Sequence, residues 1–364
     1  MGKKILVVTK DIGGGFNTLY PVVNLLRKEG YEVTVVAEGL SLKKWMGSGE
    51  EVYGGAGKCD ASLMRYDIEM ADAFEEVRPD AVIAELGAPI HLAEVFALGA
   101  NRRDIPLIFI EDLWGVSSRS KAIPRLVCSV DDFGRFMATE QYSLGGDTKV
   151  IATGNPAMDA LANVRASDSL QNFLGGVYTR GKRIVVALGQ DESTTPMLEG
   201  LVEALEQEGN YILIPRFHPK WLSDPSKAEH CNRWHSILDR AKRGSVLWLN
   251  NESTHEILTL SHIAVSIYST VLVEAAILGT IPVSWMSPIG QEKMAQALGG
   301  LRKFPLVSTG AAIGVSSADE FLSLVPKHQT AKSGAQLRET TRMVPSDGRN
   351  TERVVRAISD LLSR

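Results

Sequence analysis

The chain has 364 residues, a net charge of −4 at pH 7, and 44% hydrophobic and 23% charged residues, which is the composition of a soluble globular protein long enough for two domains. The charge balance does not favour a nucleic-acid partner, the three scattered cysteines form no disulfide framework or zinc knuckle, and no apolar run reaches the roughly 18 residues of a membrane span. Contact with a membrane surface is left open. The amino end enters an apolar strand pattern without the features of a secretory signal, which predicts a cytoplasmic protein.

The first half of the chain alternates between strand and helix patterns. Helices are predicted between several of the strands, notably at Arg65–Val77 and His91–Leu98. Such alternation indicates a parallel sheet covered by helices. The predicted strands are Lys4–Thr9, Glu32–Ala37, Ala81–Ala84, Pro106–Ile110, Leu126–Ser129 and Val150–Ala152.

A second series of the same kind follows the turn at Thr153–Pro156 and a polar stretch. We therefore predict two doubly wound, Rossmann-like domains that face each other across a cleft. Residues 1–160 would form the first domain, 161–180 a linker, 181–348 the second domain, and 349–364 a helix that packs back on the first domain. The predicted strands are Arg183–Leu188, Tyr211–Pro215, Ser245–Leu249, Ile263–Ile267, Ile281–Ser284 and Pro305–Val307, and the predicted helices are Thr195–Glu208, Ser253–Leu260, Val271–Leu278, Gln291–Leu298 and Asn350–Leu362.

The strongest functional signal is a pair of hydroxyl residues at a predicted helix start. Ser269 and Thr270 follow the strand Ile263–Ile267, and Glu274 comes one helical turn later. Free backbone N–H groups, hydroxyls and the positive end of the helix dipole favour a phosphate there. Glu274 is placed to accept hydrogen bonds from a ribose diol. A helix cap with a solvent-facing glutamate is the alternative interpretation.

Two further loops of the second half carry groups that suit a phosphate. Gln190 lies in a polar loop directly after the strand Arg183–Leu188, where helix capping is an equally good explanation. Arg216 and His218 follow the strand Tyr211–Pro215, and Pro219 restricts His218 to an extended backbone. Cations here would neutralise a diphosphate as a bond to it breaks, whereas a solvated loop is the alternative.

The first half places glycines and carboxylates at strand ends. Gly13, Gly14 and Gly15 follow the first strand without forming a dinucleotide or Walker motif, so the loop is either a tight turn or a segment that touches substrate. Strand-end carboxylates point to the rim where a general base is needed, with a cap or a loop ion pair as the alternative. These candidates are Asp11, Glu85, Glu111 and Asp112, and Trp114 would add a stacking surface beside the last two.

Metal chemistry has little support. The chain has no Asp-x-Asp, and His255-Glu256 lacks the second histidine of a His-Glu-x-x-His site. We therefore predict a reaction without a metal.

Taken together, these motifs resemble the GT-B superfamily of nucleotide-sugar enzymes over most of the chain. The glycine loop, Tyr20-Pro21 and residues 30–33 look like the start of MurG-type transferases, with Phe16 and Asn17 where that family commonly has a histidine. Val150–Leu161 is similar to the Thr-Gly-Asn…Asp-Ala-Leu segment of UDP-N-acetylglucosamine 2-epimerases, although their Arg-Pro-Glu loop is missing. His218-Pro219 with Ser269, Thr270 and Glu274 looks like glycerophosphate and polysialic-type polymerases of the same fold.

The resemblance implies a nucleotide-activated donor, UDP-linked, that is a substrate and no cofactor. The second domain would bind it, with His218 on the diphosphate, Ser269 and Thr270 on its phosphates, and Glu274 on the ribose. A glycan, lipid or small-molecule acceptor would lie on the first domain near Gly14, and domain closure would exclude water.

Three functions remain as hypotheses. The first is a metal-independent glycosyltransferase in which Glu111 or Glu85 acts as base. The second is a nucleotide-sugar 2-epimerase or hydrolysing relative. The third is a module that binds a nucleotide or glycan without catalysis.

Overall fold

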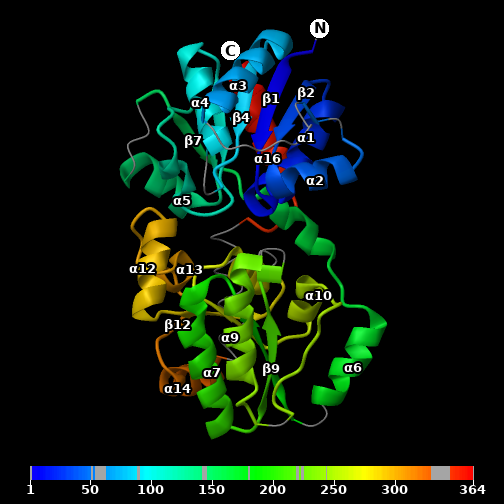
Figure 1. Ribbon diagram of the computed structural model, residues 1–364, viewed down its shortest axis with the longest axis vertical. Coiled ribbons are helices and arrows are strands. Elements are labelled where there is room, and N and C mark those ends of the chain that lie inside the picture. The colour runs from blue at the N-terminus through cyan, green and yellow to red at the C-terminus, as the bar shows by residue number, and fades with distance from the viewer. Residues whose placement is uncertain are drawn as a thin grey trace. The chain divides into compact units, whose positions relative to one another are not determined.

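The chain forms two compact units, which are described separately. The computed structural model describes residues 2–50, 52–53, 63–87, 91–141, 146–178, 181–218, 221–222, 225–242, 244–328 and 345–363. Unit 1 comprises Met1–Ala160 together with Val344–Arg364, and unit 2 comprises Leu161–Met343. Each unit is a parallel sheet with helices on its faces (Figure 1).

The described part of unit 1 contains a sheet of 7 parallel strands in the order β3-β2-β1-β4-β5-β6-β7. Strands β1 and β4 are neighbours, while β1 continues along the chain to β2 on its other side. The sheet therefore changes winding direction between β1 and β4, as in a Rossmann fold. The strands are β1 (Lys4–Thr9), β2 (Glu32–Ala37), β3 (Val52–Tyr53), β4 (Ala81–Ala84), β5 (Leu107–Ile110), β6 (Leu126–Ser129) and β7 (Lys149–Ala152).

Helices cover both faces of this sheet because its strands are apolar on both sides. In β1, Leu6 and Val8 belong to the core shared with α3 and α4, whereas Ile5 and Val7 belong to the core shared with α1 and α16. The carboxyl-terminal segment thus supplies one of the helices of unit 1. The helices are α1 (Thr18–Lys28), α2 (Gly39–Gly47), α3 (Leu63–Val77), α4 (His91–Arg102), α5 (Asp132–Phe136) and α16 (Asn350–Leu362), with short turns η1 (Ile12–Asn17), η2 (Val116–Arg119), η3 (Met137–Gln141) and η4 (Pro156–Asn163).

The described part of unit 2 contains a sheet of 5 parallel strands in the order β12-β11-β10-β8-β9. A single parallel bridge from Leu213 to Val246 extends it beyond β9. Strands β8 and β10 are neighbours, so the winding direction changes between them. The strands are β8 (Arg183–Leu188), β9 (Tyr211–Arg216), β10 (Ile263–Ser266), β11 (Ile281–Trp285) and β12 (Ile313–Val315).

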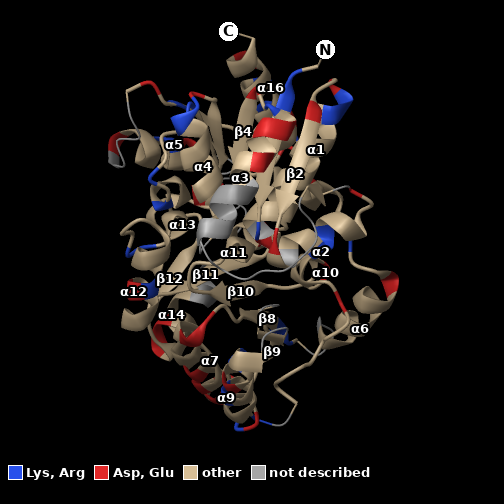
Figure 2. Ribbon diagram, turned by 45° about the horizontal axis from the view of Figure 1, so that its top comes forward, with Lys and Arg blue, Asp and Glu red and all other residues tan. Residues whose placement is uncertain are grey.

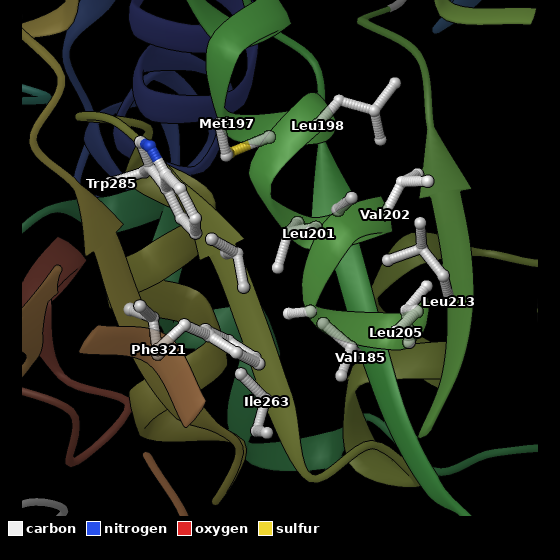
Figure 3. Packing of buried hydrophobic residues seen from close by; sticks show 14 of the residues in the cluster. Val185, Met197, Leu198, Leu201, Val202, Leu205, Leu213, Ile263, Trp285 and Phe321 are labelled. Atoms are coloured by element: carbon white, nitrogen blue, oxygen red, sulfur yellow. The ribbon is translucent and has the colours of Figure 1, made fainter. Parts of the chain in front are cut away.

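The helices of unit 2 are amphipathic, and α7 illustrates how they are held. Its apolar side chains, including Leu201 and Leu205, pack on Val185 of β8 and Leu213 of β9 (Figure 3). Its glutamates are exposed on the outer face, and Figure 2 shows β10 and β11 in tan because neither carries a charged residue. The helices are α6 (Asp168–Tyr178), α7 (Thr195–Gln207), α9 (Ala228–Leu238), α10 (Thr254–Thr259), α11 (Thr270–Ile277), α12 (Pro288–Ala297), α13 (Pro305–Ser308) and α14 (Ala318–His328), with short turns η5 (Glu192–Thr194) and η6 (Pro225–Lys227).

Some predicted elements are wrong. Residues 305–307, predicted as a strand, lie in helix α13, because Phe304 is extended and Pro305 occupies the first helical position, where proline is well tolerated. The predicted strand at 245–249 pairs with β9 through the Val246 bridge alone. The segment predicted as a linker contains α6, and α2, α5, α9, α14, β3 and β12 were not predicted.

Candidate functional site

The carboxyl ends of β8 and β10 define the candidate nucleotide site of unit 2. The chain leaves β8 through η5 into α7, and it leaves β10 directly into α11. In open α/β sheets, ligands bind at the carboxyl ends of the two strands where the winding direction changes. Ser269, Thr270 and Gln190, all predicted to bind the donor, lie at this edge.

Ser269 caps the first turn of α11. Its backbone is extended (φ −74°, ψ 142°), and its Oγ accepts a hydrogen bond from the N–H of Val271 at 3.3 Å. Thr270 is the first residue of the helix, and both hydroxyl residues are partly exposed. The local sequence thus builds a helix start with hydroxyls at the position where an anion is stabilised by the helix dipole.

Glu274 lies one turn further along α11 and is held by a histidine of α10. The distance from Glu274 Oε2 to His255 Nε2 is 2.7 Å. The Glu274 side chain is 16% exposed and that of His255 is 41% exposed. The hydrogen bond to Glu274 raises the pKa of His255, against an opposing effect of burial. The sequence did not predict that His255 and Glu274 are in contact, because they are 19 positions apart.

Arg216 holds a loop of the protein itself. At the end of β9, its guanidinium donates to the carbonyl oxygen of Leu249, to that of Glu252 at 2.9 Å, and to Thr254 Oγ1 at 3.1 Å. Arg216 is one of the residues predicted from the sequence to bind the donor. The structure shows it fixing the segment that leads into α10, since that segment returns to the end of β9.

The remaining predicted donor residues lie at the ends of the neighbouring strands. Gln190 follows β8, and its buried Oε1 has no hydrogen-bond partner among the described residues. His218 is partly exposed just after β9, while Pro219 lies outside the described residues. The sequence did not single out Tyr268, whose hydroxyl donates to Asp191 Oδ2 at 3.1 Å and so links the loops after β10 and β8.

The corresponding edge of unit 1, at the ends of β1 and β4, carries carboxylates. One of them, Glu85, is hydrogen-bonded to the segment that follows β1. Glu85 is 3% exposed and accepts hydrogen bonds from the N–H groups of Lys10 and Asp11 and, at 2.7 Å, from the hydroxyl of Thr9. Burial raises the pKa of Glu85, although these hydrogen bonds oppose the rise. A Cβ at Gly15 would come within 2.3 Å of both Glu85 Oε2 and Thr9 Oγ1. Glu85 therefore anchors the glycine loop.

Asp11 also has a structural role in this loop. Its carboxylate accepts a hydrogen bond from the N–H of Ile12 at 2.7 Å and caps η1, the turn that contains Gly13, Gly14 and Gly15. Asn17 is the last residue of that turn and is exposed.

Glu111 and Asp112 lie side by side at the end of β5 in different surroundings. Glu111 is 0% exposed, Oε1 accepts from the N–H of Ser117 at 3.1 Å, and Oε2 has no hydrogen-bond partner among the described residues. Burial raises the pKa of Glu111 to about 7, which the hydrogen bond from the N–H of Ser117 partly opposes. Asp112 is partly exposed and lies against the glycine loop, since a Cβ at Gly14 would be 2.9 Å from Asp112 Oδ2.

The pKa of Asp112 also lies above its usual range. Burial raises it, and the positive charge of Arg119 opposes the rise. Asp112 is thus a partly exposed carboxylate whose pKa is raised by burial.

Trp114, expected to provide a stacking surface, is buried. It is 1% exposed and its Nε1 donates to Asp131 Oδ2 at 2.8 Å. Burial raises the pKa of Asp131 to about 6. The indole therefore anchors the loop after β5, of which it is part, to Asp131.

The Thr-Gly-Asn…Asp segment fastens the carboxyl-terminal helix to unit 1. Asp159 accepts hydrogen bonds from the N–H groups of Asn350 and Thr351, at 2.9 and 2.8 Å, which are the first residues of α16. The side chain of Asn350 donates to the carbonyl oxygen of Asn155 at 2.9 Å. Asn155 in turn donates to the carbonyl oxygen of Asp112 at 3.1 Å. This segment therefore joins α16 to the loop that carries Asp112.

The described residues show neither a metal-ligand cluster nor a membrane-spanning helix. They contain no group of three or more His, Cys, Asp or Glu side chains arranged to hold a metal ion. Within the same part of the chain, no helix has the length and apolar character needed to cross a bilayer.

Comparison with solved structures identifies the fold. No family model matches the chain, and no curated protein matches its sequence. UDP-GlcNAc 2-epimerase from Neisseria meningitidis, solved with UDP-GlcNAc, is similar with a TM-score of 0.66 at 14% identity, over 98% of this chain and 100% of the other. A glycosyltransferase from Rickettsia africae gives 0.64 at 12% identity over 100% and 98%. HepE from Anabaena, solved with UDP and glucose, gives 0.62 at 14% identity over 99% of each chain.

These similarities show that the chain has the two-domain α/β fold of these solved structures. Epimerases and glycosyltransferases both share it, so the fold leaves the reaction open.

Proposed function

We propose that this protein is a GT-B glycosyltransferase that moves a sugar from a UDP-linked donor to an acceptor hydroxyl without a metal ion. The observation that carries the proposal is the start of α11. A capped helix terminus with Ser269 and Thr270 lies at the carboxyl edge between β8 and β10, and Glu274 follows one turn later. Solved neighbours of the same fold contain UDP or UDP-GlcNAc, which supports a uridine nucleotide as the ligand.

In this proposal, unit 2 binds the donor through α11. The backbone N–H groups and the hydroxyls of Ser269 and Thr270 bind the diphosphate, and Glu274 accepts hydrogen bonds from the ribose. His218 adds a donor beside the diphosphate. As the sugar bond breaks, negative charge develops on the departing UDP, and a fixed helix dipole stabilises that charge more than it stabilises the intact donor. This contribution replaces the one that a divalent cation makes in other transferases.

The acceptor would bind unit 1 beside the glycine loop, with Asp112 as general base. Asp112 lies against Gly14, is partly exposed and has a raised pKa, so it is placed to take the proton of an attacking hydroxyl. Glu111, our first candidate for this role, is wholly buried, and Glu85 and Asp11 are bonded to the loop backbone. We assign these three carboxylates to the support of the loop and of Asp112.

The proposal is tested by UDP binding and by the Asp112→Asn variant. UDP should raise the melting temperature of the protein, because a ligand that binds only the folded state stabilises it. With a UDP-sugar and an acceptor from a panel of glycans, lipids and small molecules, Asp112→Asn should lower kcat by about 100- to 1,000-fold, the usual contribution of a general base.

The controls separate catalysis from binding. The affinity of Asp112→Asn for UDP should remain that of the wild type, and the exposed Asp132→Asn variant should keep full activity. Activity of the wild type should survive EDTA. An undiminished kcat in Asp112→Asn would remove Asp112 from the mechanism, and the absence of any UDP binding would overturn the proposal as a whole.

A 2-epimerase is the second candidate function. Solved UDP-GlcNAc 2-epimerases, including that from Neisseria meningitidis, share the fold of the chain, which supports this alternative. Incubation with UDP-N-acetylglucosamine alone distinguishes the two reactions. A transferase leaves the nucleotide sugar intact, whereas formation of its 2-epimer, or of UDP and N-acetylmannosamine, would replace the transferase proposal by this one.

A further inference from the structure

We infer that His255 is a positioning residue for nucleotide binding: by holding Glu274 it makes the site select ribonucleotides over 2′-deoxyribonucleotides. This inference rests on the proposed function, because it assigns Glu274 to the ribose of the donor. His255 lies on α10, whereas Glu274 lies on α11. In the sequence, His255 was considered only as part of an incomplete zinc motif.

The geometry divides the two oxygens of the Glu274 carboxylate between protein and ligand. Oε2 lies 2.7 Å from His255 Nε2, a distance typical of a charge-assisted hydrogen bond. Oε1 is then the oxygen that can accept from a ribose hydroxyl. Glu274 is on the same face of α11 as Thr270, four residues earlier, so this oxygen and the phosphate-binding helix start serve one ligand.

His255 can orient Glu274 because helix α10 is itself fixed at both ends. At its start, Arg216 donates to Thr254 Oγ1 at 3.1 Å and to the carbonyl oxygen of Glu252 at 2.9 Å. At its end, the buried hydroxyl of Thr280 donates to the carbonyl oxygen of Leu258. A chain of contacts therefore runs from β9 through Arg216, α10 and His255 to the carboxylate.

The contact with Glu274 favours the protonated imidazole. The hydrogen bond to Glu274 raises the pKa of His255, so a larger share of the ring carries a proton on both nitrogens and donates to the carboxylate. Without the ring, Glu274 would sample several rotamers, and ordering one of them on binding would cost affinity.

Selectivity for ribose follows from a fixed carboxylate. A site built to hydrogen-bond a hydroxyl rejects the analogue that lacks it, because the buried acceptor loses its partner without regaining water. A carboxylate released from His255 can turn away to solvent, so the missing 2′-hydroxyl then matters less. Loss of His255 should consequently weaken binding of the ribonucleotide more than that of the deoxyribonucleotide.

The test is calorimetric titration of UDP and 2′-deoxy-UDP into the full chain and its variants. The wild type should prefer UDP by about tenfold, the equivalent of one hydrogen bond to a charged group. His255→Ala should bind UDP about tenfold more weakly and bind the two nucleotides with nearly equal affinity. His255→Gln, whose amide can still donate, should recover most of the preference. His235→Ala removes an exposed histidine that stacks on Trp248 and should behave as the wild type.

The outcomes separate this inference from the proposed function. If His255→Ala keeps the preference for UDP while Glu274→Ala loses UDP affinity, the nucleotide site stands and the role of His255 is wrong. If His255→Ala weakens both nucleotides equally, its role is structural and the inference is overturned. If Glu274→Ala binds UDP as the wild type does, the proposed donor site itself fails.

Discussion

The two units have the same parallel architecture but treat the carboxyl edges of their sheets differently. In unit 1, the carboxylate after β4 is fully hydrogen-bonded within the protein. Glu85 accepts from the N–H groups of Lys10 and Asp11 and from the hydroxyl of Thr9. In unit 2, the Ser269 hydroxyl caps α11 and Glu274 Oε2 bonds to His255, and our proposal assigns the other oxygen of Glu274 to a ligand. The same position in a Rossmann-like sheet closes a loop in unit 1, and in our proposal it presents a site in unit 2.

The carboxyl edges of the two sheets also differ in the charge of the groups that they carry. Asp11, Glu85, Glu111 and Asp112 make the edge of unit 1 acidic, which suits an incoming hydroxyl that must lose a proton. The helix start of α11 presents N–H groups and hydroxyls, which suit an anion. The division of labour that we propose follows from this contrast.

The largest expected effect comes from removing Glu85, the carboxylate that bonds to the glycine loop of unit 1. Glu85→Ala leaves the N–H groups of Lys10 and Asp11 and the Thr9 hydroxyl without their buried acceptor, which should cost about 3–5 kcal/mol of unfolding free energy. Equilibrium urea denaturation measures this loss, with the exposed Glu75→Ala as control. A loss below about 1 kcal/mol would mean that Glu85 does not anchor the glycine loop.

The next effect concerns the pH dependence of unit 1. The pKa of Glu111 is about 7 in the folded protein against 4.5 ordinarily, so the folded state binds more protons between these values and stability falls as pH rises. Glu111→Gln removes this term and should gain roughly 2–3 kcal/mol on the wild type between pH 5 and pH 8.

Denaturation of the wild type and of Glu111→Gln at the two pH values measures this difference. The exposed Glu140→Gln variant should follow the wild type at both. A constant difference between Glu111→Gln and the wild type would show that Glu111 titrates normally.

The smallest expected effect comes from removing the cap of α11 in unit 2. Ser269→Ala removes the cap of α11 and should cost about 1 kcal/mol of stability together with a loss of UDP affinity. Ser287, which caps α12 through the N–H of Gly290 at 3.2 Å, provides a matched comparison. Ser287→Ala should lose similar stability and keep its UDP affinity. Equal UDP affinity in both variants would show that Ser269 acts as a helix cap alone.

Much of the fold could be predicted because its strands are short apolar runs between turns. Residues 4–9 and 183–188 were placed to the residue, since buried parallel strands are continuously apolar. The run at 305–307 was misassigned because a short apolar segment is compatible with either strand or helix. Only the tertiary context, in which β12 takes the edge position of the sheet, decides between them.

The arrangement of the candidate site was predictable where its residues are local in sequence. Ser269, Thr270 and Glu274 belong to one helix, so their spacing alone places them together. The return of residues 249–254 to Arg216, and that of α10 to Glu274, depend on tertiary packing that no periodicity encodes. The sequence therefore indicated the carboxylate but not the histidine that holds it.

Hydrogen exchange of the whole protein with and without UDP tests the central claim most directly. UDP should slow exchange in residues 267–276, at the start of α11, and in α10, because ligand contacts protect the backbone that they order. Glu274→Ala should abolish that protection. Protection confined to the glycine loop at residues 10–17, with none at the start of α11, would place the nucleotide on unit 1 and contradict the account.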